Sequence, residues 1–210
     1  MGCDIHLCVE KRRTKGWFRD FKPKPYSPEW EKILEQLNQN PEWLSCRISS
    51  ERPWSQRHYG VFAKLADVRN FDNLEHLPLR GFPKDACFFT LCKYARRIVP
   101  DSEYDEDNYD TIPESRANEY IKKGYSKEIT VQNVPRSWKD WKFVTDSDYH
   151  SPNWCTLKEL EDAVKEIFYE EEEEVGDYVE YSEEWLALIG YMKGLEMAGF
   201  ETRCVFWFDN

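Results

Sequence analysis

Two short segments of the chain each place an acidic residue two positions before a histidine. Asp4 and His6 lie at the start of the sequence, and Asp148 and His150 lie in its second half. Carboxylate oxygens and imidazole nitrogens are ligands for divalent ions such as Mn²⁺, Mg²⁺ or Zn²⁺. If the two pairs converge, all four side chains would hold one ion, which would activate water against a phosphoester. This hypothesis makes His6, His150 and Asp148 the candidate catalytic residues.

Each pair also has a purely structural explanation. An aspartate before a helix can cap backbone amides, and a histidine in a strand can pair with a neighbouring carboxylate without binding a metal. The sequence has no spacing typical of zinc sites, no glycine-rich phosphate loop and no nucleophile elbow. Both interpretations therefore stay open, and common nucleotide-enzyme families are disfavoured.

Arginines in polar turns suggest a second kind of chemistry. A guanidinium group binds phosphate through two parallel hydrogen bonds, and aromatic rings stack on nucleobases. The chain is rich in rings, with 9 Trp, 12 Tyr and 12 Phe. The alternative is that these arginines pair with nearby acids. The candidate residues for binding a small nucleotide are Arg69, Asn70, Arg80, Ser151 and Trp154.

Charge and cysteine content limit the classes of partner. The chain has 210 residues and a net charge of −11, which argues against binding to duplex DNA through its phosphates. An acidic surface instead fits simple solubility, divalent cations, or the blocking of a basic host protein. Seven cysteines, no signal-peptide pattern and no apolar run near 20 residues predict a cytoplasmic protein without a membrane partner. A homo-oligomer is also left open.

The strongest strand patterns lie at the two ends of the chain. In a first strand, Asp4, His6, Cys8 and Glu10 would share one face, while Ile5, Leu7 and Val9 would enter a core from the other. The β-branched and aromatic run 202–209 predicts a buried last strand. If these two strands pair antiparallel, Asp209 approaches Asp4 and His6.

Helical periodicity and capping signals predict helices over 59–66, 157–168 and 183–198, the second opened by a capping box at Thr156 and the third ended by Gly199. A hairpin ending near residue 21 and a short helix before Pro41 are also expected. Residues 87–98 fit either a helix or a buried strand, 100–113 an exposed loop, and 146–154 a turn. We therefore expect a single α+β domain over 1–210, in which a mostly antiparallel sheet contains the N- and C-terminal strands and is covered by several helices.

Five segments together resemble a family of uncharacterised bacteriophage and prophage proteins: MGCDIH (1–6), YGVFAKLADVRN (59–70), RGFPKD (80–85), DYHSPNW (148–154) and VFWFDN (205–210). The resemblance implies a phage protein that acts in the cytoplasm of a bacterial host. It also implies that 22–52 and 99–140 are variable insertions. The family has no established activity. The polar positions that it points to are Asp4, His6, Arg69, Arg80, Asp148, His150, Ser151 and Trp154.

The leading hypothesis is an anti-defence accessory protein that binds and sequesters a small phosphate-bearing ligand, such as a cyclic or ADP-ribose-type nucleotide immune signal. Its pocket would contain His6, Arg69, Arg80, His150 and aromatic rings. A metal-dependent phosphoesterase that degrades such a nucleotide is the main alternative. A weaker alternative is an acidic protein that blocks a host protein.

Overall fold

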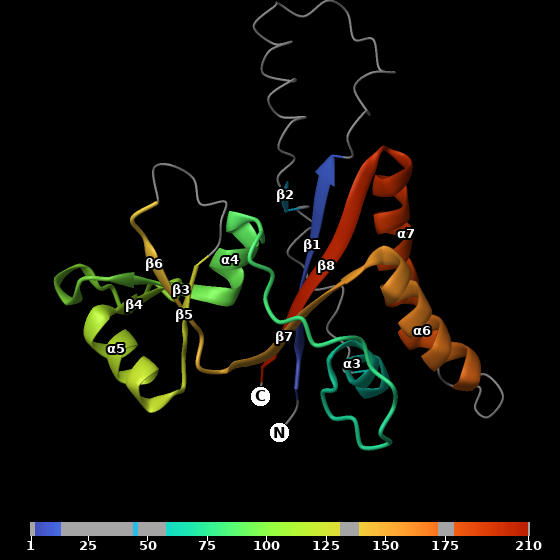
Figure 1. The fold of residues 1–210 in the computed structure, drawn as a ribbon, viewed down its shortest axis with the longest axis horizontal. Helices are drawn as coiled ribbons and strands as arrows, with labels where there is room; N and C mark the ends of the chain where they lie inside the picture. Colours follow the sequence, from blue (N-terminus) through green and yellow to red (C-terminus); the bar gives the residue numbers. More distant parts are fainter. Residues whose placement is uncertain (1–2, 14–43, 46–57, 131–138, 172–178, 210) are drawn as a thin grey trace, which may run out of the picture.

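The computed structural model describes residues 3–13, 44–45, 58–130, 139–171 and 179–209. These residues form an α+β fold with two four-stranded sheets, shown in Figure 1. The strand order is β2-β1-β8-β7 in sheet A and β4-β3-β6-β5 in sheet B. The predicted fold class is therefore confirmed.

Sheet A contains both ends of the chain. It consists of β1 (Ile5–Arg13), β2 (Leu44–Ser45), β7 (Tyr149–Thr156) and β8 (Phe200–Asp209), and every pairing in it is antiparallel. The register of β1 and β8 runs from Ile5 opposite Phe208 to Arg13 opposite Phe200. The start of β1, the end of β8 and the start of β7 therefore meet at one end of the sheet, where the two chain termini lie in Figure 1.

Three helices cover one face of sheet A: α3 (Tyr59–Ala66), α6 (Leu157–Glu171) and α7 (Val179–Met197). The helix α3 has the predicted bounds, whereas α7 begins four residues earlier than expected, at Val179 instead of 183. At the start of α6, the Glu159 carboxylate accepts a hydrogen bond from the Thr156 backbone N–H (2.9 Å), and the Thr156 hydroxyl accepts one from the Glu159 backbone N–H (3.3 Å), as the capping-box motif predicts. The apolar side chains of β1 and β8 on this face pack between the helices; the largest fully buried side chains here are Phe62, Phe206, Phe208, Leu65, Leu160, Leu188 and Met192.

Sheet B occupies the segment between α3 and β7. Its strands are β3 (Ala95–Val99), β4 (Thr111–Pro113), β5 (Glu128–Ile129) and β6 (Lys142–Thr145), and only β3 and β4 are parallel. The helical elements of this segment are α4 (Phe88–Tyr94), the short 3₁₀ helix η1 (Asp101–Glu103) and α5 (Glu114–Lys123). The expected loop over 100–113 thus ends in a buried strand, and the ambiguous segment 87–98 forms a helix followed by a strand.

Both faces of sheet A are packed. On the face away from α6 and α7, the buried rings of Tyr94 and Trp207 lie 5.3 Å apart between centroids, and Cys8 and Val205 pack in the same cluster. The face of β1 that the sequence pattern predicted to be polar therefore lies under α4 and sheet B. The end of the sheet near His6 is partly open, since the His6 side chain is 32% exposed.

The segment 146–154 is not a turn throughout, because it enters strand β7 at Tyr149. The hairpin ending near residue 21 and the helix before Pro41 lie outside the described residues. Among the helices that the structure describes, none combines the length and the apolar character needed to cross a membrane.

Candidate ligand site at the end of sheet A

Asp209, at the end of β8, joins the two terminal strands. Its backbone N–H donates to the carbonyl of Asp4 (3.2 Å), and its carboxylate accepts the Asp4 backbone N–H at Oδ1 (3.0 Å). The other oxygen, Oδ2, lies 3.0 Å from Nε2 of His6. The predicted approach of Asp209 to Asp4 and His6 is confirmed, because the antiparallel register places these residues opposite one another.

Aromatic rings fix the orientation of His6. Its imidazole stacks on Trp207, with 5.8 Å between centroids and 7° between planes, and lies 4.9 Å from the ring of Tyr149. Trp207 is buried, so the imidazole rests against a rigid surface on one side. Asp209 holds the ring from its edge, and the two contacts together leave His6 a single orientation.

His150 lies on the other face of the same sheet end. Its ring stacks on Phe208 at 6.0 Å, its Nε2 is 4.0 Å from Sγ of the buried Cys3, and its Nδ1 is 3.0 Å from the Ser151 hydroxyl. Arg69, from the loop after α3, hydrogen-bonds the Cys3 thiol and places its guanidinium 5.0 Å from the ring of Tyr59. Arg69, His150 and Ser151 are thus linked through Cys3 into one row of hydrogen-bond donors.

The Cys3 thiol is neutral at physiological pH. Burial raises the pKa of this thiol, the hydrogen bond and positive charge of Arg69 oppose the rise, and the carboxylates of Asp209 and Asp4 reinforce it. A neutral, buried thiol is a poor nucleophile. We therefore assign Cys3 a positioning role between Arg69 and His150.

Two of the donor residues have unusual backbone conformations. Arg69 has a φ of 52° and Ser151 a φ of 47°, both in the left-handed region that residues other than glycine rarely adopt. Ser151 also lies in the register shift between His150 and Asn153, where β7 bulges against β8. Strained residues and bulges are concentrated at functional sites, where they aim a side chain.

The two Asp-x-His pairs do not converge. His6 contacts Trp207, whereas His150 contacts Phe208, the next residue along β8, so the two imidazoles lie on opposite faces of the sheet. Asp148 is exposed in the turn before β7, where its N–H donates to Asp146 Oδ1 at 3.1 Å. Among the residues that the structure describes, no three His, Cys, Asp or Glu side chains are grouped to hold a metal ion. The predicted metal site of Asp4, His6, Asp148 and His150 is therefore wrong, and Asp148 does not join either histidine as a catalytic group.

The predicted ligand residues Arg80 and Trp154 lie elsewhere along β7. Arg80 donates two hydrogen bonds to the carboxylate of Glu159 and a third to the carbonyl of Trp154, and its guanidinium lies 4.6 Å from the Trp154 ring centroid. Asn70 bonds the side chain of Asp67 and the backbone of Leu74, which closes the turn after α3. These three residues have structural contacts, and the structure does not bring Arg80 or Trp154 into the row around Cys3.

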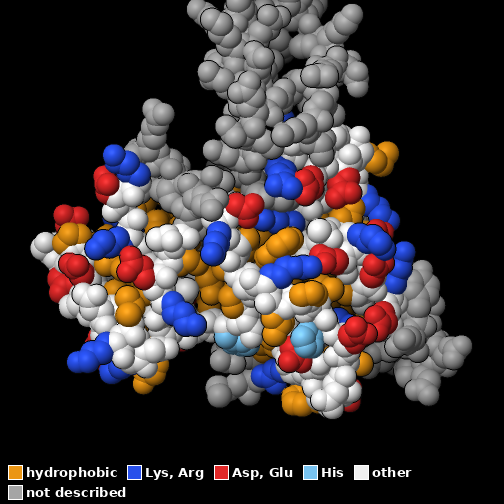
Figure 2. Space-filling model, in the orientation of Figure 1, with side chains coloured by type: hydrophobic (Ala, Val, Ile, Leu, Met, Phe, Trp, Pro, Cys, Tyr) orange, Lys and Arg blue, Asp and Glu red, His pale blue; other side chains and the backbone are white. Residues whose placement is uncertain are grey.

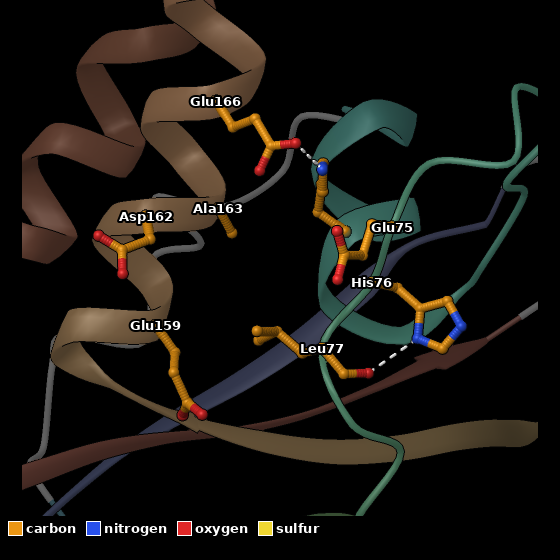
Figure 3. Close-up of a pocket in the computed structure, with 8 residues that line it drawn as sticks. Glu75, His76, Leu77, Glu159, Asp162, Ala163 and Glu166 are labelled. Atoms are coloured by element: carbon orange, nitrogen blue, oxygen red, sulfur yellow. Dashed lines mark hydrogen bonds and ion pairs between the residues drawn. The ribbon is translucent and has the colours of Figure 1, made fainter.

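A separate hollow lies between α3, the segment after it, and α6, as Figure 3 shows. Its volume is about 280 Å³, and its polar lining consists of Lys64, Glu75, His76, Glu159, Asp162 and Glu166. Lys64 is already paired with Glu166. The four carboxylates would repel an anion, so this hollow does not suit a phosphate.

Sequence reasoning missed the buried ion pair of Glu10 and Arg203. Arg203 donates from Nε (2.8 Å) and Nη2 (2.6 Å) to Glu10, which also accepts the Cys87 backbone N–H at 2.8 Å. Both side chains are almost completely buried. Cys3 was missed as a neighbour of His150, although its position two residues before Ile5 could have placed it on the same face.

The sequence matches no protein-family model, and no curated protein or solved structure was found to be similar.

Proposed function

We propose that this protein is a phage accessory protein that binds and sequesters a small phosphate-bearing ligand, of the class of nucleotide immune signals, at the end of sheet A. The observation that carries the proposal is the row of donors around Cys3. Arg69 and Ser151, each in a left-handed backbone conformation, flank His150 there. The resemblance to phage and prophage proteins supplies the anti-defence setting.

The chemistry of this row suits a phosphate. A guanidinium, an imidazole and a hydroxyl all donate hydrogen bonds, and a bidentate guanidinium contact is among the strongest interactions with a phosphate group. On the face in Figure 2, the Lys and Arg side chains of the described residues are interspersed with Asp and Glu and form no continuous basic surface. A small anion captured at one point fits this surface better than a long nucleic acid, which needs many basic contacts.

Calorimetric titration with cyclic dinucleotides and ADP-ribose derivatives tests the proposal. Arg69→Gln removes the guanidinium, and we expect it to weaken binding by about 10- to 100-fold, because hydrogen bonds to charged groups contribute about 1.5–3 kcal/mol. Arg12→Gln is the matched control, since Arg12 pairs with Glu201 on the exposed surface at the other end of β1. Equal affinity of both variants and the wild type would contradict the assignment of Arg69.

A further inference from the structure

The loop after α3 holds an aromatic ring in solvent, two residues after Arg69. Phe71 is 78% exposed, and in the part of the chain that the structure describes no other ring packs against it. Its backbone N–H donates to the carbonyl of Arg69 at 2.9 Å, which closes a tight turn between the two residues. A phenylalanine exposed to this extent contributes little burial energy, so packing does not explain why the ring is there.

The loop fixes this ring through its backbone. Asn70 donates to the Asp67 carboxylate and to the Leu74 carbonyl, both at 2.8 Å, and accepts the Leu74 N–H at 2.7 Å. One side chain thus joins both ends of the loop. Asp67 and Asn73 have positive φ angles of 58° and 55°, which further define its path. A loop that is already ordered presents its side chains to a ligand at little cost in conformational entropy.

The loop and the row of donors lie on the same face of sheet A. His150 stacks on Phe208, and Phe208 packs against Phe62 of α3 at 5.1 Å between ring centroids, so the row is on the face that α3 covers. The loop that carries Phe71 is at this face too, because Arg69 is itself a member of the row. A ligand can therefore contact both without passing around the sheet.

The separation of Arg69 and Phe71 suits one nucleotide. Two residues of chain span at most about 7 Å, and the turn between these two shortens that distance. In a nucleoside monophosphate, a single sugar joins the base to the phosphate. A phosphate at the Arg69 guanidinium therefore leaves the base within reach of the Phe71 ring. Aromatic side chains stack on every nucleobase, because each base has a π-face.

We infer that Phe71 recognises the base of a nucleotide by stacking, while Arg69, His150 and Ser151 hold its phosphate. This inference rests on the proposed binding of a phosphate-bearing ligand, and it assigns the residue that distinguishes a nucleotide from a sugar phosphate. Arg69 contributes to the binding of every ligand that carries a phosphate. Phe71 contributes only where a base is present.

Calorimetric titration of the full-length protein with adenosine 5′-monophosphate and with ribose 5-phosphate tests the inference, because the two compounds differ in the base alone. We expect the wild type to bind the nucleotide about 10-fold more tightly than the sugar phosphate, which is the effect of one stacked base. Phe71→Ala should remove this difference, and Phe71→Trp should keep it. Arg69→Gln should weaken the binding of both compounds. Tyr109→Ala is the matched control, since Tyr109 is an exposed aromatic residue (81%) in the segment of sheet B.

The outcomes separate the two proposals. If the wild type binds both compounds with equal affinity, the stacking inference is wrong and the proposed phosphate binding stands. An unchanged affinity of Phe71→Ala for the nucleotide has the same meaning. If neither compound binds, the stacking inference fails, and the panel of cyclic dinucleotides and ADP-ribose derivatives decides the proposed function by itself. The comparison on the wild type needs no variant, and circular dichroism checks that Phe71→Ala folds.

Discussion

Replacing Glu10 with alanine should strongly destabilise the fold. Glu10 is fully buried and Arg203 is 3% exposed, and the Glu10 carboxylate accepts two hydrogen bonds from Arg203 and one from the Cys87 backbone. Removing one partner of a buried ion pair typically costs about 3–5 kcal/mol, because the remaining charge stays out of water. Arg203 would keep a hydrogen bond to Asp85 Oδ1 at 2.8 Å. We therefore expect a loss near the lower end of that range, about 3 kcal/mol.

The same two strands provide a matched control. Glu10 lies opposite Arg203, and two residues along the register Arg12 lies opposite Glu201. The second pair makes two hydrogen bonds, at 2.6 and 2.8 Å, but its side chains are 35% and 43% exposed. Exposed ion pairs contribute about 0–1 kcal/mol. Glu201→Ala should therefore cost no more than about 1 kcal/mol.

Urea unfolding at pH 7, followed by circular dichroism, measures both variants against the wild type. The difference between the two glutamate substitutions isolates the effect of burial, since the residue change and the type of partner are the same. If Glu10→Ala and Glu201→Ala change the free energy of unfolding by the same amount, the explanation from burial is refuted. A loss below 1 kcal/mol for Glu10→Ala would have the same meaning.

Three further predictions concern other buried polar groups. His58 caps α3 by accepting the Val61 N–H at Nδ1, and burial lowers the pKa of His58 from its ordinary 6.5. Below about pH 6.5 the unfolded chain therefore binds more protons than the folded protein, and the free energy of unfolding falls. His58→Asn should lessen this fall. Equal shifts of the urea midpoint between pH 7.5 and 5.5 in the wild type and the variant would argue against this prediction. Burial raises the pKa of Cys8 to about 12. Iodoacetamide at pH 8 should therefore label this thiol far more slowly in the native protein than in urea, which mass spectrometry of the peptides measures. Equal labelling rates would count against the prediction. Buried Asn153 donates hydrogen bonds to the carbonyls of Leu65 and Pro78 and accepts one from the Arg80 backbone N–H. Asn153→Asp removes both donated bonds and should lower the free energy of unfolding by about 2–3 kcal/mol. An unchanged urea midpoint would mean that these bonds add no net stability.

Local sequence signals were sufficient to predict much of the fold. The predicted helix over 59–66 has the bounds of α3, and the Thr156–Glu159 capping box opens α6 as expected. Both signals act within a few residues along the chain, so they can be read without tertiary information. The antiparallel pairing of the first and last strands was also predicted, because these two segments have the strongest strand character.

The candidate site was only partly predictable. The register of β1 and β8 brings Asp209 to His6 as proposed, and the donors Arg69, His150 and Ser151 do meet. The spacing of Asp148 and His150 suggested a copy of the Asp4–His6 pair, but it does not encode the face on which a side chain lies. A one-residue difference in register against β8 sends His6 and His150 to opposite faces, because side chains alternate along a strand.

The sequence by itself determined several local features of this protein: the bounds of α3, the capped start of α6, which end segments form strands, and which side chains are able to donate to a phosphate. Only the tertiary structure decided which of those side chains meet. It paired Arg80 with Glu159, buried Glu10 beside Arg203, and placed Cys3 between Arg69 and His150. The physical reason is that capping and periodicity are interactions between near neighbours in the chain. Burial, register and the choice of ion-pair partner depend on segments up to 205 residues apart.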